Sequence, residues 1–310
     1  MANRRTVLVT GATGKQGGAV ARQLLARGYH VRAMTRKPES GNAQALAELG
    51  AEIVQGDLDE AALLTKVVRG AWGVFSLQNT WEAGVEREEE QGKRLAQIAR
   101  DAGVQHFVYS SVGSAHRQTA IPHFENKWRI EETVRSLGFP SYTILRPVFF
   151  MENFLSPPLK TGIDEGKLTL TLKPTTVLQM IAVEDIGKHG ARAFESHEEL
   201  NGREIDIAGD ARTMPETARI LGEAAGREIE FVPTSIEEVR QFSADYAAML
   251  EWFDAVGYDA DIEGVAHESG IQPTTLPEWV AQVDWTPGAE SERKAYARSA
   301  AGNSGKSSGS

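Results

Sequence analysis

Short apolar runs alternate with amphipathic stretches through the first half of the chain. A short run rich in β-branched residues predicts a buried strand, whereas apolar positions spaced three and four residues apart predict a helix. By these patterns strands are expected near 6–10, 30–34, 52–55, 72–77, 105–110 and 141–146, and helices near 17–28, 42–49, 60–68, 85–102 and 123–137. This alternation indicates an α/β fold with a parallel, doubly wound sheet built from right-handed βαβ units.

The regular alternation of short apolar runs and amphipathic stretches changes after Pro147. Later strands are expected at 167–172, 203–207 and 228–232, and helices near 184–195, 214–225, 236–256 and 276–282. We therefore expect a first domain over 1–150, with its sheet completed by later segments, and a smaller C-terminal α/β lobe over 151–290. The last residues, SAAGNSGKSSGS, have almost nothing apolar to bury, so 291–310 is expected to be a disordered tail.

A cluster of glycines follows the first predicted strand. Residues 7–18 read VLVTGATGKQGG, so Gly11, Gly14 and Gly17 form a G-x-x-G-x-x-G turn between a strand and a helix. Gly11 permits the sharp reversal, Gly14 lets the backbone approach a pyrophosphate, and Gly17 lets the helix pack close to the strand. The spacing is not that of a P-loop. The alternative is an ordinary strand-to-helix turn; otherwise the pattern predicts a dinucleotide site that also includes Thr13, Lys15 and Gln16.

The end of the second predicted strand indicates which dinucleotide would bind. An acidic residue that grips the ribose 2′-hydroxyl of NAD is expected about 20 residues beyond the glycines. Thr35, Arg36 and Lys37 stand there instead, and the next carboxylate is Glu39. A guanidinium forks onto a phosphate and an adjacent ammonium adds a second positive charge, so Arg36 and Lys37 favour NADP(H). The alternative is a solvated Arg-Lys pair at the end of a strand.

The third predicted strand runs into GDLDE at 56–60. Asp57 could accept a hydrogen bond from the adenine amino group, and Leu58 could cover the face of the adenine ring. Alternatively, Asp57 or Asp59 caps the following helix. Both interpretations of this segment remain open.

Composition narrows the class of protein. The 310 residues carry a net charge of −10, so the surface repels a phosphate backbone and nucleic acid is not an expected partner. The chain has no cysteine, which excludes disulfides and thiolate metal sites and fits a reducing compartment. No apolar run is long enough for a signal peptide or a membrane span, so we expect a cytoplasmic protein. No metal is expected, because His106, His116 and His123 lack the spacing and carboxylate partners of a site.

Several short segments carry a resemblance to a known family. They are GATGKQGG after the first strand, TRK at 35–37, GD at 56–57, YSSVG at 109–113, HFENK at 123–127, LRPVFFMENF at 145–154 and VEDIG at 183–187. Together they resemble the NmrA-like branch of the atypical short-chain dehydrogenase/reductases, over about residues 5–285. The resemblance implies a Rossmann-like domain that binds NADP(H) and a small lobe that closes over the nicotinamide end. This family includes NADPH-dependent quinone, triphenylmethane dye and phenylpropanoid reductases, and also redox sensors that bind the cofactor without turnover.

The chain departs from the ordinary short-chain dehydrogenase pattern at one position. That pattern is Tyr-x-x-x-Lys, in which the tyrosine is the acid/base and the lysine holds the ribose. Lys127 stands in the lysine position, but His123 replaces the tyrosine, and their spacing puts both on one helix face. His123 could donate a proton near neutral pH, or it could be a wall of the pocket without a chemical role. Lys127 could donate one if burial made its ammonium more acidic, as the matching lysine is thought to do in the phenylpropanoid reductases. The alternative is that Lys127 is an exposed lysine on the helix.

The resemblance also assigns residues along the cofactor and the substrate. Ser110 could orient a substrate carbonyl, unless this serine and its neighbour only cap a turn. The residues expected along the cofactor, besides those of the glycine turn and the second and third strands, are Gln78, Ser110, Ser111, Lys127, Pro147 and Phe149. Unless they belong to the apolar core, the residues expected to face a substrate are Phe150, Asn153 and Phe154.

Two functions remain open from the sequence. The first is an NADPH-dependent reductase of a small electrophilic acceptor such as a quinone, because hydride transfer to such an acceptor needs less acid help than ketone reduction. The second is an NADP(H)-sensing regulatory protein without turnover, whose partner is another protein. Lys127 and the aromatic segment after Pro147 favour the reductase, whereas the missing tyrosine favours the sensor. The oligomeric state is left open.

Overall fold

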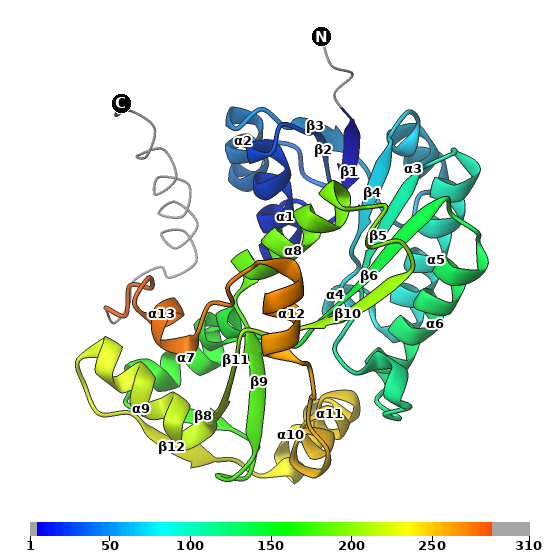
Figure 1. The fold of residues 1–310 in the computed structure, drawn as a ribbon. Coiled ribbons are helices and arrows are strands. Elements are labelled where there is room, and N and C mark those ends of the chain that lie inside the picture. The colour runs from blue at the N-terminus through cyan, green and yellow to red at the C-terminus, as the bar shows by residue number, and fades with distance from the viewer. Residues whose placement is uncertain (1–4, 287–310) are drawn as a thin grey trace, which may run out of the picture. The chain divides into compact units, whose positions relative to one another are not determined.

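The computed structural model describes residues 5–286, which form two compact units (Figure 1). Among the described residues, the first unit comprises 5–148, Val183–Ala208 and Tyr258–Pro273. The second comprises Phe149–Ala182, Gly209–Gly257 and 274–286. Two late segments of the chain therefore return to the first unit. The tail predicted over 291–310 lies outside the described residues.

A parallel sheet of seven strands forms the centre of the first unit. In chain order the strands are β1 (Thr6–Val9), β2 (His30–Thr35), β3 (Glu52–Gln55), β4 (Gly73–Ser76), β5 (His106–Ser110), β6 (Ser141–Pro147) and β10 (Arg203–Ile207). Their order across the sheet is β10-β6-β5-β4-β1-β2-β3. β1 therefore pairs with β2 on one side and with β4 on the other, so the strand order reverses at β1. In open α/β sheets a ligand binds at this reversal, outside the carboxyl ends of the strands.

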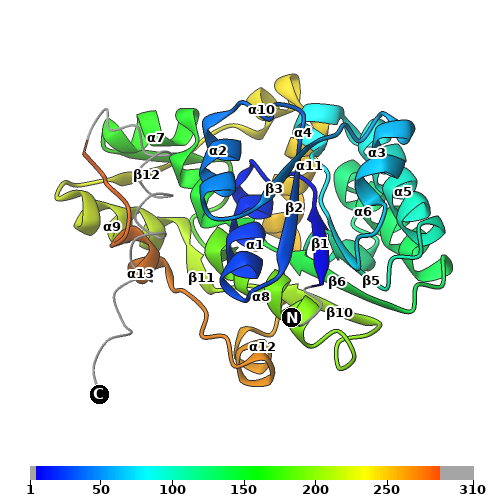
Figure 2. The same cartoon turned by 90° about the horizontal axis from the view of Figure 1, so that it is seen from above.

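Helices cover both faces of this sheet, which is the doubly wound arrangement expected (Figure 2). One face carries α1 (Lys15–Ala26), α2 (Gly41–Glu48) and α8 (Val183–Glu195), and the other carries α3 (Ala61–Val68), α5 (Val85–Asp101) and α6 (Pro122–Ser136). Short elements α4 (Thr80–Ala83), η1 (Ala115–Arg117) and α12 (Ile262–Ser269) complete the unit. Small residues let α1 and α8 approach closely: a Cβ added to Gly187 would lie 2.9 Å from the Cβ of Ala19.

A cluster of apolar side chains forms the core between the sheet and the α3–α5–α6 layer. Leu8, Val74, Phe107 and Ile144 project from neighbouring strands and are buried with side chains from these helices. All of β5 is buried, as a central parallel strand between two helical layers should be. Burial of this apolar surface is the main favourable term that stabilises the sheet.

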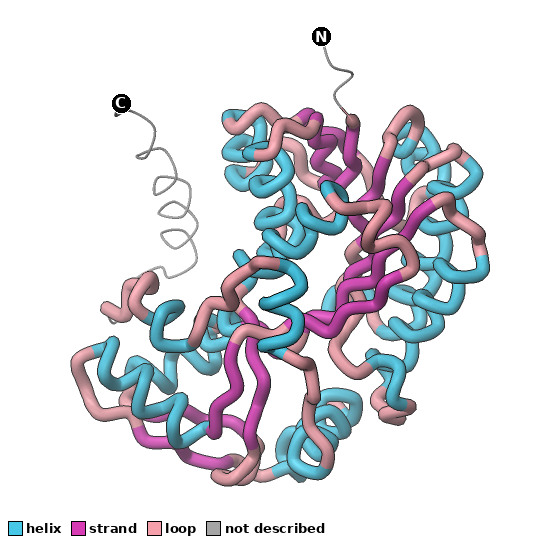
Figure 3. Tube along the Cα trace, viewed as in Figure 1, coloured by secondary structure: helices cyan, strands magenta, loops and turns pink. Residues whose placement is uncertain are grey.

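The second unit contains two smaller sheets (Figure 3). β9 (Val177–Ile181) lies between β7 (Phe149–Phe150) and β11 (Asp210–Thr213), and β8 (Lys167–Leu170) pairs with β12 (Glu230–Pro233). Its helical elements are η2 (Met151–Leu155), α7 (Pro157–Asp164), α9 (Met214–Ala225), α10 (Ile236–Phe242), α11 (Ala244–Ala255) and α13 (Leu276–Val280). The α/β class with a Rossmann-like parallel sheet is confirmed.

Some details of the predicted elements were wrong. The single helix expected over 236–256 is two helices, because Ser243 adopts an extended conformation and its side chain caps α11 by accepting from the N–H of Tyr246. The strands β9 and β11 were missed, as were α7 and α12. These elements are 4 to 8 residues long, so each has few positions from which an apolar period can be recognised.

Candidate functional site

The glycine turn joins β1 to α1 at the carboxyl edge of the sheet. Gly11 has a φ of +60°, a conformation that favours glycine. A Cβ on Gly14 would come within 3.3 Å of the Gly11 carbonyl oxygen, and a Cβ on Gly17 would overlap that carbonyl. The turn is thus so tight that side chains at these positions would fill the space beside the Gly11 carbonyl.

The start of α1 is suited to a negatively charged group. Gly14 is the N-cap residue and supplies no side-chain acceptor, and no acidic residue occupies the first turn of the helix. The backbone N–H groups and the helix dipole at such an end favour an anion. Thr13, Lys15 and Gln16 all lie at this turn, and Gln16 is buried, so its side chain faces inward.

The end of β2 presents a guanidinium beside the glycine turn. Thr35 is buried, and its hydroxyl lies 3.4 Å from that of Thr13 and accepts the N–H of Lys37 at 3.1 Å. Arg36 is exposed and forms an ion pair of 2.5 Å with Glu82 of α4. The sequence analysis did not single out Glu82. The structure therefore brings the predicted phosphate-reading arginine to the turn but gives its guanidinium a carboxylate partner.

Asp57 and Leu58 lie in the loop between β3 and α3. The carboxylate of Asp57 accepts the backbone N–H of Asp59 at 3.0 Å, which closes a local turn. The N-cap of α3 is Glu60, with no hydrogen bond from its side chain, so neither aspartate caps this helix as the alternative interpretation held. Leu58 is partly buried against the core of the sheet. Their contact with adenine stays a prediction.

Buried polar atoms gather after β4 and β5 and on α6. Within residues 5–286, Gln78 Oε1, Ser111 Oγ, Ser114 Oγ and Asn126 Oδ1 are buried without a hydrogen-bond partner. An unpartnered buried polar group costs about 1–3 kcal/mol, so such groups are usually satisfied by a ligand or by water. Ser110 is also buried, and its hydroxyl donates to Oε1 of Gln16. The carboxyl edges of β1 and β5 are thereby linked.

Lys127 lies one turn after His123 on α6, and both side chains are buried. The His123 ring lies 5.2 Å from that of Trp81 and 4.9 Å from that of Phe124. Lys127 Nζ lies 2.5 Å from Oε1 of Glu88, a fully buried carboxylate on α5. The sequence analysis missed Glu88.

The environment of Glu88 keeps its carboxylate ionised. Burial by itself would raise the pKa of Glu88, but the charge of Lys127 and hydrogen bonds from Lys127, Thr80 and Asn126 together lower it below its ordinary value. The amide of Asn126 donates to Oε2 at 2.9 Å, and the hydroxyl of Thr80 donates to the same oxygen. Each partner of the carboxylate is thus a donor, as a buried anion requires.

Residues expected around the nicotinamide and the substrate fall in different units. Pro147 ends β6 in the first unit, and its carbonyl accepts the N–H of Gly113 at 2.8 Å. Phe149, Phe150, Asn153 and Phe154 belong to the second unit. There Phe154 is fully buried, with its ring 5.8 Å from that of Phe149 and 6.4 Å from that of Trp279. It is part of the apolar interior of that unit. A substrate role for Phe150, Asn153 and Phe154 and a cofactor contact for Phe149 stay predictions.

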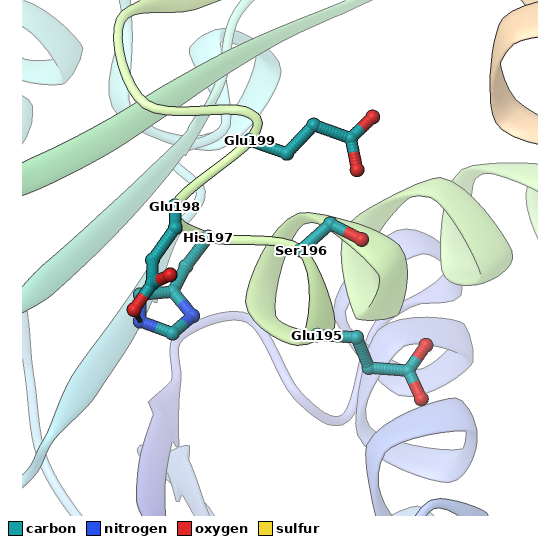
Figure 4. Close-up of a pocket in the computed structure, with 5 residues that line it drawn as sticks. All are labelled: Glu195, Ser196, His197, Glu198 and Glu199. Carbon is teal, nitrogen blue, oxygen red and sulfur yellow. Dashed lines mark ion pairs between the residues drawn. The ribbon is translucent and has the colours of Figure 1, made fainter.

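One hollow lies away from the glycine turn (Figure 4). It has a volume of about 370 Å³ and is lined by residues 195–199, which follow α8. Glu195 pairs at 2.9 Å with Arg27, which follows the last turn of α1. Because α1 begins at the carboxyl edge of the sheet, its end lies at the opposite edge. This hollow is therefore separate from the candidate dinucleotide site.

Two general features complete the description of the site. Over residues 5–286, no group of three or more His, Asp or Glu side chains is arranged to hold a metal ion. In the same part of the chain, no helix combines the length and apolar character that a membrane crossing requires.

Two relatives of the chain are oxidoreductases by name. An NmrA-like family domain-containing oxidoreductase of Aspergillus versicolor is 35% identical over 240 residues, which is 69% of this chain and 67% of the relative. A second NmrA-like family domain-containing oxidoreductase, from Cladobotryum sp., is 31% identical over 253 residues, or 73% of this chain and 75% of the relative.

Solved structures with the same fold contain NADP(H). The triphenylmethane reductase of Citrobacter sp., complexed with NADP(H), has a TM-score of 0.75 and 23% identity, over 89% of this chain and 99% of that one. The quinone oxidoreductase of Escherichia coli, complexed with NADPH, has a TM-score of 0.74 and 23% identity, over 89% and 98%. NmrA, a negative transcriptional regulator in complex with NADP, has a TM-score of 0.72 and 22% identity, over 90% and 94%.

The family model agrees with the motifs singled out above. The model for the NmrA-like family matches residues 3–287, which includes the glycine turn, the end of β2 and the Lys127 segment. NADP(H) is the cofactor in the solved structures of this family, which agrees with the preference predicted from Arg36 and Lys37. Since the match spans both units and the Aspergillus relative is 35% identical, the chain belongs to the NmrA-like family.

Proposed function

We propose that the protein binds NADP(H) at the carboxyl edge of the seven-stranded sheet and reduces a small electrophilic acceptor such as a quinone. One observation carries the proposal: buried polar atoms of Gln78, Ser111, Ser114 and Asn126 have no partner in the described residues. They lie after β4 and β5 and on α6. β4 pairs with β1, the strand that leads into the glycine turn, and β5 lies next to β4. A ligand with hydrogen-bonding groups would satisfy them.

The turn and the strand ends fit the parts of such a cofactor. The cradle of Gly11, Gly14 and Gly17 accepts a pyrophosphate where side chains would block it. Arg36, with Lys37 beside it, would bind the 2′-phosphate through a charge-assisted contact. Asp57 and Leu58 stand where the adenine would lie.

The protein's part in the reaction is to align the acceptor with the cofactor and to protonate the acceptor. When bound, the nicotinamide supplies the hydride, and this is chemistry that the cofactor carries itself. Lys127 is buried beside Glu88, and its remaining donors would hold a ribose hydroxyl or the acceptor oxygen. Ser110 donates its hydrogen to Gln16, which ties it to the glycine turn; its role in orienting a substrate carbonyl stays a prediction. A quinone asks for little acid assistance, which suits a site where His123 replaces the tyrosine.

Turnover is tested by following the loss of NADPH absorbance with a panel of quinones, enones and dyes. Wild type and the Lys127→Ala variant are compared side by side, and NADPH binding is measured for both. We expect the wild type to oxidise NADPH with at least one acceptor and the variant to be at least about 10²-fold slower, the low end of general acid catalysis. Measurable NADPH binding without turnover by either protein would overturn the reductase proposal.

The second candidate is a regulatory protein that senses NADP(H). Two observations favour it: His123 stands in place of the tyrosine, and the fold matches that of NmrA, described as a negative transcriptional regulator in complex with NADP. Its partner would be a protein that reads the cofactor-bound surface. The result that overturns the reductase, binding without turnover, is the result that this candidate predicts.

A further inference from the structure

Lys127 has a buried carboxylate partner from a different helix. Glu88 is fully buried on α5 and accepts from Lys127 Nζ at 2.5 Å through Oε1. Its other oxygen accepts from Asn126 and Thr80. The amide of Asn126 is itself held by the carbonyl of Val85 at 2.7 Å, so this donor is fixed to α5 as well. The carboxylate is therefore rigidly placed against α6.

The packing of α5 on α6 explains how this contact is reached. Glu88 lies on the buried stripe of α5 together with Gly92, Leu95 and Ala99. A Cβ on Gly92 would lie 2.6 Å from Cδ1 of Ile130, so α5 approaches α6 as closely as a glycine allows. Ile130 stands three residues after Lys127 on the same helix. The Glu88–Lys127 contact is thus one turn away from the closest approach of the two helices.

A buried charge on an apolar helix stripe costs desolvation free energy, so its presence calls for a structural or functional explanation. Moving a carboxylate into the interior costs several kcal/mol unless it is paired and hydrogen-bonded. The neighbouring Glu89 shows the ordinary arrangement: it is partly exposed and pairs with Lys93 and Arg129 at the surface. Glu88 instead directs its charge at the one lysine that the family pattern places in the site. Of the described groups, Glu88 is the acceptor that Lys127 Nζ contacts, which leaves two of the three ammonium donors for a ligand.

We propose that Glu88 is a positioning residue that keeps Lys127 in its ammonium form, so that Lys127 serves as the proton donor of the reaction and not as a general base. This inference rests on the proposed reductase function. As hydride from NADPH reaches the acceptor, the ammonium gives one proton to the acceptor oxygen. The quinone becomes the hydroquinone, NADPH becomes NADP⁺, and the neutral amine regains its proton from water.

Other charged and titratable groups lie on the elements around this pair. They are Glu89 on α5, His123 and Glu131 on α6, Tyr109 on β5 and Glu82 on α4. Glu89 pairs with Arg129, Glu131 with Arg146, and Glu82 with Arg36. Burial, with the charges of Glu88, Glu131 and Glu89, raises the pKa of Tyr109 well above its ordinary value, so this phenol stays neutral. Glu88 is thus the charge that acts directly on Lys127.

The test compares Glu88→Gln with Glu89→Gln, which removes the neighbouring carboxylate on the outer side of the same helix. For each protein, kcat with a quinone is measured across pH, together with the NADPH Kd and the thermal midpoint. We expect Glu88→Gln to lower the pH at which activity is lost on the alkaline side by about 2 units, the usual effect of an adjacent opposite charge. Glu89→Gln should leave that midpoint in place. In the Lys127→Arg background the Glu88→Gln change should produce no shift, because a guanidinium stays charged.

A purely structural role for Glu88 would lower activity equally at every pH, and that result would overturn the inference. If Glu88→Gln does not fold, Glu88→Asp is measured in its place, because it keeps the charge and shortens the side chain. The pH at which its activity falls by half on the alkaline side is then compared with that of the wild type. Equal values support the inference only if Lys127→Arg abolishes the loss of activity at high pH.

A second readout does not depend on turnover. The ¹³Cε signal of Lys127, assigned by its loss in Lys127→Arg, reports the protonation of the amine directly. A wild type that binds NADPH and turns over no acceptor would contradict the proposed function, yet this titration would still show whether Glu88 holds the ammonium. An Nζ that titrates at the same pH in wild type and Glu88→Gln would contradict the inference.

Discussion

The guanidinium of Arg36 lies 2.5 Å from the carboxylate of Glu82, at the end of the strand where a 2′-phosphate is expected. Both side chains are more than half exposed, at 63% and 57%. An ion pair so open to water contributes about 0–1 kcal/mol. A phosphate in bidentate contact with Arg36 would gain more free energy than this ion pair contributes. The carboxylate of Glu82 can therefore be displaced, and Arg36 can still bind a 2′-phosphate.

Replacing Arg36 by alanine should weaken NADPH binding by about 1.5–3 kcal/mol, the range of a hydrogen bond to a charged group. NADH binding should barely change, because NADH has no 2′-phosphate. Calorimetric titration with both nucleotides measures the effect. The control is Arg203→Ala. Arg203 is an exposed arginine on the edge strand β10 and pairs with Glu268. Equal losses for NADPH and NADH would show that Arg36 does not read the phosphate.

Replacing Glu82 by glutamine should have the opposite effect on NADPH. Its carboxylate competes for the guanidinium of Arg36, so its removal should tighten NADPH binding by about 0.2–1 kcal/mol, the value of an exposed ion pair. The gain should shrink as salt is added, because salt screens exposed charges. The same titrations at low and high ionic strength provide the measurement. Weaker NADPH binding by Glu82→Gln would mean that Glu82 supports the site instead of competing for it.

Replacing Gly17 by alanine should destabilise the first unit and impair binding together. The added methyl would overlap the Gly11 carbonyl, and overpacking of this kind costs about 1–3 kcal/mol. Urea unfolding gives the free energy of unfolding, and NADPH titration gives the affinity. Gly41→Ala is the matched control, since a Cβ on Gly41 meets nothing within 4 Å. A stable Gly17→Ala protein with normal affinity would show that the turn can widen.

Acidification should destabilise the protein in part through His106. Burial, with a contribution from the nearby His197, lowers the pKa of His106 to about 3. The unfolded chain therefore binds one more proton than the native state between pH 6.5 and about 3, and stability is lost as the pH falls through this window. The ring also lies 2.9 Å from the Ser141 hydroxyl.

The corresponding measurement is the free energy of unfolding at pH 7 and pH 5 for His106→Gln and for the exposed His267→Gln. Each fully lost unit of pKa difference is about 1.4 kcal/mol, so the wild type should lose at least about 1 kcal/mol over this interval from His106. The His106→Gln protein should show a smaller loss, and the His267→Gln protein should behave like the wild type. An unchanged pH dependence in His106→Gln would refute this account.

Local patterns were sufficient for the parts of the site that lie in one continuous segment. The glycine turn could be recognised because its three glycines follow a buried strand and precede a helix, and the positive φ of Gly11 agrees with that interpretation. Arg36 could be placed because the end of a parallel strand lies at the ligand edge in every fold of this class. His123 and Lys127 were expected on one helix face because their spacing is one helical turn.

Pairings between distant segments could not be predicted in this way. Glu88 stands in the run Glu86, Glu88, Glu89 and Glu90, which looks like a solvated helix face. Its helical position could have indicated burial, because Glu88 lies on the stripe that continues through Gly92 and Leu95. A role for a carboxylate on such a stripe cannot be assigned until its partner is known. The same holds for Glu82, which is 46 residues from Arg36 along the chain.

The sequence by itself determined the α/β class and the parallel strands, and it predicted the dinucleotide turn and the preference for NADP(H), because each depends on residues that are neighbours along the chain. The tertiary structure decided that Val183–Glu195 and Arg203–Ile207 return to the first unit, that Arg36 meets Glu82, and that Lys127 meets a buried Glu88. These outcomes depend on which helices and strands pack together. Burial then determines whether a charged side chain faces water or another charge, and a local pattern contains no information about that partner.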